Sequence, residues 1–309
     1  MLFAPTYYKK FKCLADKCTH SCCVGWEIDI DSDTAALYAA LPGQFGDAVR
    51  SGIEKGESGA CFALHPDGRC PNLDDRGLCR IISTLGDAYL CDICREHPRF
   101  YNVVGLRTEC GVGASCEAAA ALILNEDYAV IEPLDETPGT ENGHTCGDFD
   151  AISARNALYA VLADRTVPYP ARLDTVRARF AAYAGLNGVL PDTLEYLDAN
   201  HKDLLEQSFG KEHVPTEKEA ILCERFLAYL VYRHAAEAES VAEHRSCVGL
   251  ALELERLFRS LIGQGIAPLK ASASAAWLHG AAGDICAKEL GQYGMLPSDM
   301  LSVIPRLMK

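Results

Sequence analysis

The chain has 309 residues, of which 49% are hydrophobic and 23% are charged, and this length suits one large domain or two ordinary ones. Its 29 basic and 43 acidic residues give a net charge of −14, which argues against generic nucleic-acid binding because a polyphosphate backbone would repel it. No apolar run approaches the roughly 18 residues that cross a bilayer, and the first ten residues do not resemble a secretory signal. We therefore expect a cytoplasmic protein that binds neither nucleic acid nor membrane.

The first part of the chain is expected to mix short elements with turns. Asp31-Ser-Asp-Thr precedes an apolar run and predicts a capped helix that ends at Pro42-Gly43. Residues 43–77 are rich in Gly, Asp and Pro, and they predict loops with a short hairpin near 60–64. Ser115 is expected to cap a buried helix over residues 116–125.

Residues 132–148 contain two prolines, three glycines and few apolar side chains, which predicts a linker. It would separate a cysteine-rich metal-binding module over 1–131 from an α-helical domain over 149–309. No alternation of strands and helices suggests a doubly wound sheet, so the predicted fold class is mainly α. After the linker, apolar residues three and four apart predict helices near 149–163, 171–185, 191–208, 215–239, 241–262, 269–290 and 297–307.

Fifteen cysteines are unevenly distributed, because eleven of them lie in the first 116 residues. In a reducing compartment a dense group of cysteines indicates metal binding or redox chemistry, whereas a disulfide scaffold would call for secretion. The remaining four, Cys146, Cys223, Cys247 and Cys286, are expected to be core residues, as are Cys61 and Cys110. Cys116 begins a helix, where a thiolate would be favoured, so a ligand or a reactive thiol is the alternative there.

Two groups of cysteines have the spacing of metal ligands. The first is Cys13-x4-Cys18-x3-Cys22-Cys23. The second consists of Cys70, Cys79 and the C-x-x-C pair Cys91 and Cys94. Soft thiolates suit zinc and iron–sulfur clusters, while the C-x-x-C pair alone also fits a redox dithiol or plain packing. The predicted metal ligands are Cys13, Cys18, Cys22, Cys23, Cys70, Cys79, Cys91 and Cys94.

The order and spacing of several motifs over residues 5–119 resemble the flagellin lysine-N-methylase family, which shares its cysteine module with a wider group of zinc- or iron-chelating proteins. Two departures are His97-Pro98-Arg99, where the family usually has Tyr-Pro-Arg, and the missing proline after Cys116. The helix Glu224–Arg233 is a weaker match. The motifs are Pro5-x-Tyr7, Phe11-Lys-Cys13, Cys18-x3-Cys22-Cys23-x-Gly25-Trp26, Ile28-x-Ile30-Asp31, Gly77-Leu-Cys79, Leu85-Gly86, Cys94-x2-His97-Pro98-Arg99 and Ser115-Cys116-Glu117.

This resemblance implies methyl transfer from S-adenosylmethionine to the ε-amine of a lysine in a protein substrate, of which flagellin is one candidate. It also implies a [4Fe–4S] cluster, with zinc as the alternative metal. The family's cluster cysteines fall on all the predicted ligands except Cys91. Because such a cluster needs about four thiolates, the first choice is Cys18, one of Cys22 and Cys23, Cys79 and Cys94.

The amine must lose its proton before it can accept a methyl group, since its pKa is near 10.4. Acidic residues and a histidine within the motifs are candidates for that task, although capping or surface roles are the alternative. Neither a catalytic base nor a cofactor site is assigned. The rival hypothesis is a non-catalytic zinc- or iron-binding protein with a helical partner-binding domain. The side chains that are candidates for binding the amine or accepting its proton are Glu27, Asp29, Asp31, Glu96 and His97.

Overall fold

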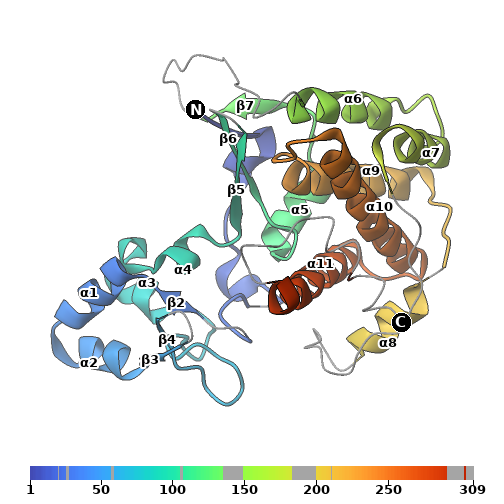
Figure 1. Cartoon of the computed structure of the whole chain (residues 1–309). Coiled ribbons are helices and arrows are strands. Elements are labelled where there is room, and N and C mark those ends of the chain that lie inside the picture. The colour runs from blue at the N-terminus through green and yellow to red at the C-terminus, as the bar shows by residue number, and fades with distance from the viewer. Residues whose placement is uncertain are drawn as a thin grey trace. The chain divides into compact units, whose positions relative to one another are not determined.

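A computed structural model describes residues 1–19, 21–25, 28–56, 59–104, 107–134, 149–182, 200–209, 211–290 and 303. The chain divides into two compact units, which are Lys12–Arg99 and the combination of Met1–Phe11 with Phe100–Lys309. We call the first the cysteine unit and the second the helical unit. Helices predominate among the described residues, as the sequence predicts (Figure 1).

The cysteine unit combines short helices with one small sheet. The sheet has the order β2-β4-β3, and all its pairs are antiparallel, with Asp29 opposite Cys61 and Ile53 opposite Phe62. Its core includes Ile28, Tyr38 and Ile81. The elements are β2 (Asp29–Ile30), α1 (Ser32–Ala40), α2 (Gly43–Ser51), β3 (Ile53–Lys55), β4 (Ala60–Phe62), α3 (Arg80–Leu85) and α4 (Asp92–Glu96), with 3-10 turns at Ala15–Lys17 and Asp87–Tyr89.

The predicted start of α1 is confirmed, because the carboxylate of Asp31 accepts a hydrogen bond from the Thr34 N–H at 2.9 Å. A hairpin does form here, but it lies earlier than the predicted 60–64, because β4 at Ala60–Phe62 pairs with β3 at Ile53–Lys55. The prediction of loops from residue 43 onward is wrong for α2. That helix buries only Gly46 and Val49, so its apolar stripe is too narrow to outweigh its glycines in the sequence.

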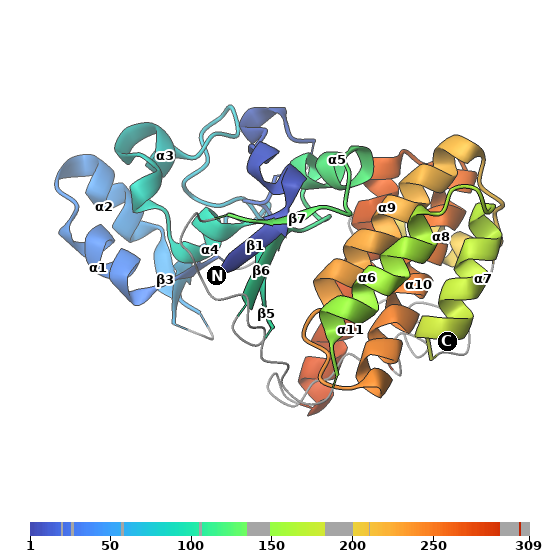
Figure 2. The same cartoon turned by 90° about the horizontal axis from the view of Figure 1, so that it is seen from above.

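The helical unit contains a sheet that the sequence analysis did not predict. Its order is β5-β6-β1-β7, in which β1 runs parallel to β6 and antiparallel to β7 (Figure 2). Leu2 lies opposite Thr108 and Phe3 opposite Pro133, so the pairing joins residues more than a hundred positions apart. The strands are β1 (Leu2–Pro5), β5 (Arg99–Val104), β6 (Arg107–Val112) and β7 (Ile131–Pro133).

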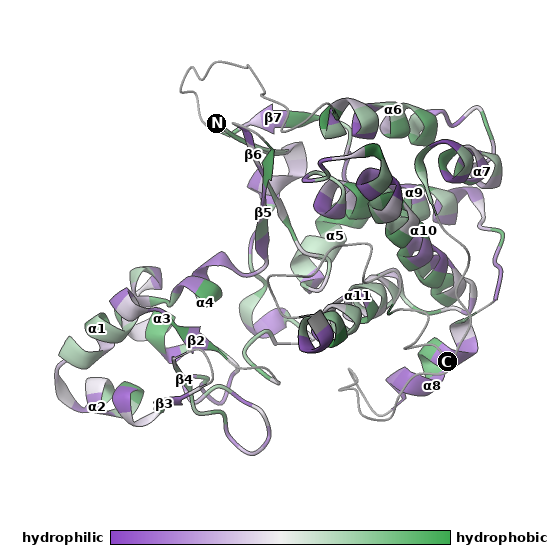
Figure 3. Ribbon diagram, in the orientation of Figure 1, coloured by the Kyte–Doolittle hydropathy of each residue, from purple (hydrophilic) through white to green (hydrophobic). Residues whose placement is uncertain are grey.

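The helices of this unit follow the predicted order. Apolar residues recur along α5, α9 and α10 (Figure 3), and α10 packs against both α9 and α11. The helix predicted at 297–307 lies outside the described residues except for Val303, and so does the 191–199 part of another. The helices are α5 (Glu117–Asn125), α6 (Ala151–Ala163), α7 (Tyr169–Phe180), α8 (His201–Ser208), α9 (Glu217–His234), α10 (Val241–Gly263) and α11 (Pro268–Leu290), with a 3-10 helix at Thr6–Lys10.

The compact units differ from the sequence-based division into 1–131 and 149–309. Residues 1–11 and 100–134 supply strands and a helix that pack with the later helices, so they join the helical unit. Residues 135–148 of the predicted linker lie outside the described part of the chain. Within the described residues, no helix combines the length and the apolar character needed to cross a membrane.

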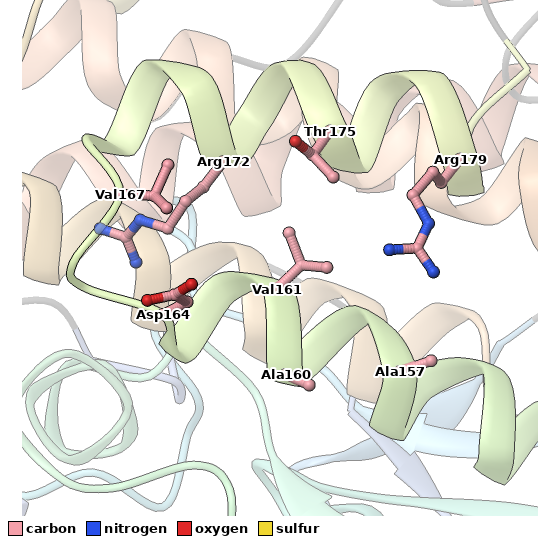
Figure 4. Close-up of a pocket in the computed structure, with 8 residues that line it drawn as sticks. All are labelled: Ala157, Ala160, Val161, Asp164, Val167, Arg172, Thr175 and Arg179. Carbon is pink, nitrogen blue, oxygen red and sulfur yellow. The ribbon is translucent and has the colours of Figure 1, made fainter.

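A pocket of about 430 Å³ lies between α6 and α7 in the helical unit. Figure 4 shows Arg172 and Asp164 at one end and Arg179 at the other, with Val161 between them. Arg172 is held by the buried carboxylate of Glu224 at 2.7 Å. No residue that the sequence predicted for a functional site lines this pocket.

Candidate metal centre

Cys23 and Cys70 are brought together by backbone pairing between residues 23–25 and 68–70. The N–H of Cys70 donates to the carbonyl of Cys23 at 2.9 Å, and the N–H of Gly25 donates to the carbonyl of Gly68 at 2.9 Å. Both glycines have positive φ, of 87° and 80° respectively, which glycine adopts without strain. The turn chemistry therefore fixes two predicted ligands that are 47 residues apart in sequence.

Cys79 follows a tight turn that Asp74 organises. One oxygen of Asp74 accepts hydrogen bonds from the N–H groups of Arg76 and Leu78, each at 2.9 Å. The turn returns the chain so that Cys79 pairs with Leu73, three residues after Cys70. Hydrogen bonds from Leu78 and Arg76 lower the pKa of Asp74, so the ionised carboxylate holds the turn.

Cys91 and Cys94 lie on the first turn of α4. The N–H of Cys94 donates to the carbonyl of Cys91 at 3.1 Å, which is the local geometry that C-x-x-C spacing favours. Asp31, whose other oxygen caps α1, accepts a hydrogen bond from the Asp92 N–H at 2.9 Å. One carboxylate thus ties the start of α1 to the start of the helix that carries this pair.

The side chains of five predicted ligands lie near one another. Cys70 and Cys91 are buried in the core of the cysteine unit, at 6% and 0% exposure, and Cys23, Cys79 and Cys94 pack against that core. Their charges also interact across the group, because Cys70 and Cys79 act on Cys23, and Cys23 and Cys70 act on Cys94. None of these five thiols is in a disulfide. We call Cys23, Cys70, Cys79, Cys91 and Cys94 the thiol group.

Two pairs of neighbouring thiols are joined by a hydrogen bond between their side chains. A hydrogen bond from Cys23 lowers the pKa of Cys22 to about 7, and the same bond, together with burial, raises the pKa of Cys23. A hydrogen bond from Cys94 likewise lowers the pKa of Cys91 and raises that of Cys94. Burial raises the pKa of Cys70 as well. In each pair one sulfur is therefore poised to carry negative charge while its neighbour retains the proton.

Nearby cations are directed to other partners. Arg95 binds Asp92 and the Leu90 carbonyl, and Arg69 donates to the Asp74 carbonyl at 3.0 Å. The charged groups that shift the pKa values of the thiol group are other cysteines and Asp31, which carry negative charge when ionised. Since clustered buried thiolates are costly without a compensating cation, the donor set is chemically suited to a metal.

The arrangement differs from that of a single-ion site. Among the described residues, no three His, Cys, Asp or Glu side chains are placed so that they could hold one metal ion. Cys13 is exposed, and its sulfur accepts a hydrogen bond from the Ala15 N–H at 3.3 Å, a contact within its own turn. Cys22 is joined to the thiol group by a side-chain hydrogen bond with Cys23. Cys18 is half-buried at the end of a 3-10 turn. The eight-ligand set remains a prediction.

The other cysteines mostly occupy core positions, as expected. Cys61 and Cys110 are 3% and 0% exposed, and Cys223, Cys247 and Cys286 are buried in the helical unit. Cys116 is half-buried at the residue preceding α5, which places the N-cap one position after the predicted Ser115. Cys146 lies outside the described residues.

The proton-acceptor candidates separate into different environments. Asp31 has both oxygens occupied by backbone N–H groups. Asp29 has a buried Oδ1 that accepts no hydrogen bond from the described part of the chain. Burial lowers the pKa of His97, which favours its neutral form. Glu27 lies outside the described residues.

Sequence reasoning missed the residues that support the thiol group. Tyr38 is 1% exposed, donates to the Tyr89 carbonyl at 2.7 Å, and has its pKa raised first by burial and then by the charges of Cys91, Cys94 and Cys79. Its ring packs near Phe62, with centroids 5.9 Å apart. Thr34 and Tyr38 are the two buried residues of α1, but nothing in the sequence connects that helix to the cysteines.

Comparison with known proteins finds relatives that include proteins named Lysine-N-methylase. A Lysine-N-methylase of Salmonella typhimurium is 27% identical over 135 residues, covering 41% of this chain and 33% of that protein. The Flagellar biosynthetic protein FliU of Salmonella muenchen is 29% identical over 139 residues, covering 41% of this chain and 78% of that protein. These relatives confirm the resemblance to the flagellin lysine-N-methylase family that the motifs predicted.

The similarity is partial along the chain. It spans about a third of the Lysine-N-methylase, which is a longer protein. A shorter segment of 56 residues is 41% identical to the Bifunctional NAD(P)H-hydrate repair enzyme Nnr of Moorella thermoacetica, covering 18% of this chain and 11% of that enzyme. No family model and no solved structure matches the chain.

Proposed function

We propose that this chain is a protein-lysine N-methyltransferase that uses S-adenosylmethionine, with flagellin as its first candidate substrate. The similarity to proteins named Lysine-N-methylase carries this proposal. The name FliU of a further relative supports a flagellar substrate. The thiol group supports the second part of the proposal, which is that the cysteine unit binds an iron–sulfur cluster.

The residues that would hold the cluster are those of the thiol group. Cys22 is the alternative ligand to its neighbour Cys23. Four thiolates suffice for such a cluster, so the five cysteines of the thiol group would be enough to bind it. If one iron of such a cluster kept an open coordination position, it would supply a site that could orient a polar cofactor. The protein contributes the backbone turns at 68–70 and 74–78, which bring the sulfurs together.

In the transfer itself, a bond forms between the lysine nitrogen and the methyl carbon while the bond from that carbon to the sulfonium breaks. The sulfonium keeps the electron pair and becomes a thioether, and the ammonium proton must leave to a base before attack. Asp29 is our candidate for that base, because its buried Oδ1 has no hydrogen-bond partner among the described residues. An unpaired buried carboxylate oxygen favours an incoming cation such as the lysine ammonium.

The test uses the full chain, purified without oxygen and incubated with flagellin and S-adenosylmethionine carrying a labelled methyl group. We expect label on flagellin lysines, located by mass spectrometry, and at least a tenfold lower rate for Asp29→Asn. The matched control is Asp33→Asn, in the first turn of α1, which should keep its rate. Absence of label on flagellin and on whole-cell protein would contradict the methyltransferase, and an unchanged rate for Asp29→Asn would contradict only the base.

A second function is favoured by the thiol group, which suits a metal whether or not the chain transfers a methyl group. In that case the chain would bind zinc or iron and use its helical unit for a partner. Calorimetry with S-adenosylmethionine distinguishes the two functions, because a purely metal-binding protein has no affinity for the methyl donor.

A further inference from the structure

Arg233, at the end of α9, has an unusual set of neighbours. Its guanidinium carbon lies 4.7 Å from the centre of the Phe100 ring, and its Nη1 donates to the Tyr229 hydroxyl at 3.3 Å. Gly111 makes this possible, because a Cβ atom there would overlap the Phe100 ring. Among the described residues, no carboxylate lies within ion-pair distance of Arg233. Its half-buried charge is therefore supported by a ring face and a phenol alone.

Other buried arginines of the helical unit are paired differently. Each has a carboxylate that is almost fully buried: Arg155 has Glu109, Arg172 has Glu224 and Arg259 has Glu255. Such pairing is the usual requirement for a charge removed from water. Arg233 is half-buried and has no such carboxylate among the described residues, so its guanidinium can still accept an anion as a partner.

Two histidines add further donors beside Arg233. The rings of His234 on α9 and His279 on α11 have centroids 4.1 Å apart. Burial lowers the pKa of both, and the positive charge of Arg233 lowers each further, which places both imidazoles within its field. Each neutral imidazole still has one N–H to donate. The cluster thus contains one fixed positive charge and two neutral imidazoles, each with an N–H to donate.

Stabilisation of the α9 C-terminus does not explain the cluster. A cation in the last turn can bind the terminal carbonyls, but the buried amide of Asn102 already donates to the carbonyls of Tyr232 and Arg233, at 3.1 and 3.2 Å. A metal cation is disfavoured as well, because Arg233 would repel it. In addition, the planes of the two imidazole rings are only 31° apart, so the rings lie nearly face to face. The sign of the charge and the set of donors both favour an anion.

We propose that Arg233, His234 and His279 form a binding site for an oxyanion, meaning a carboxylate or phosphate group of a small molecule. The planar guanidinium matches the two oxygens of such a group, and the imidazole N–H groups supply further hydrogen bonds. Phe100 and Tyr229 hold the guanidinium in place before the ligand binds. The site is independent of the methyltransferase proposal, because it is built from residues of the helical unit alone.

The test titrates the full chain with inorganic phosphate by calorimetry at constant ionic strength, and follows the ring C–H resonances of the two histidines by NMR. We expect saturable binding, with shifts of both histidines, and at least tenfold weaker binding in Arg233→Gln. The matched control is Arg225→Gln, a half-buried arginine of the same helix that donates to the Leu124 carbonyl and should leave binding unchanged. Parallel titrations with acetate and S-adenosylhomocysteine distinguish a carboxylate ligand from a phosphate ligand.

Three outcomes would overturn the proposal. These are no saturable binding of any of the three anions, equal binding by Arg233→Gln, and equal weakening by Arg225→Gln, which would indicate general surface charge. If Arg233→Gln does not fold, the histidine shifts of the unmodified protein decide alone, since binding elsewhere would leave His234 and His279 unmoved.

Discussion

Replacing Glu224 by glutamine should destabilise the helical unit more than any exposed charge change. Glu224 is fully buried, and its oxygens bind Arg172 at 2.7 Å, Arg165 at 2.9 Å and the Tyr128 hydroxyl at 3.1 Å. Arg172 is 5% exposed, so the change leaves a buried cation without its partner, which costs about 3–5 kcal/mol. The side chain of Arg165 is 53% exposed and adds at most about 1 kcal/mol.

Urea denaturation followed by circular dichroism measures this effect. Glu224→Gln should lower the free energy of unfolding by about 3–5 kcal/mol, and adding Arg172→Met should restore part of the loss because the buried charge is then removed. The control is Asp174→Asn, whose exposed pair with Arg177 is worth less than about 1 kcal/mol. If Glu224→Gln cost no more than Asp174→Asn, the buried ion cluster would not have the role assigned to it.

Three further changes test other parts of the fold. His244 is 3% exposed, and burial lowers its pKa from 6.5 to about 4. Since the unfolded chain then binds the proton more readily, the free energy of unfolding should fall by about 3 kcal/mol as the pH drops from above 6.5 to 4. His244→Leu should remove this pH-dependent loss, which urea titrations at pH 8 and pH 5 measure. Gly111→Ala should cost about 1–3 kcal/mol by displacing Phe100, while Gly280→Ala, which meets no atom within 4 Å, should not destabilise in the same thermal melts. Asp31→Ala removes hydrogen bonds to two backbone N–H groups and should cost about 1–2 kcal/mol, and a melting temperature equal to that of the unmodified chain would contradict its role.

Local patterns in the sequence predicted the elements that depend on near neighbours. Asp31 could be identified as a cap because its partner is three residues away. The long helices could be identified from apolar spacing, and α9 begins with a complete capping box between Thr216 and Glu219. Each of these signals lies within one or two turns of chain.

Pairing between distant segments was not predictable in the same way. β1 and β6 are short, and their register depends on residues more than a hundred positions apart. The cysteine spacing indicated that a site exists, but the association of Cys23 with Cys70 depends on backbone pairing across 47 residues. Cys13 also satisfies the spacing pattern, and its sulfur accepts a hydrogen bond from the Ala15 N–H within its own turn. Spacing alone does not say which of the eight sulfurs bind a metal.

Iron and acid-labile sulfide, measured on anaerobically purified protein together with its visible spectrum, test the central proposal most directly. We predict about four irons and about four sulfides per chain with a brown absorbance, lost when Cys79 and Cys94 are both replaced by alanine, which leaves three cysteines of the thiol group, and kept on Cys247→Ala, whose thiol is buried in the helical unit. A colourless protein without iron or sulfide would contradict the cluster, and a double variant that kept both would contradict the thiol group as its ligands.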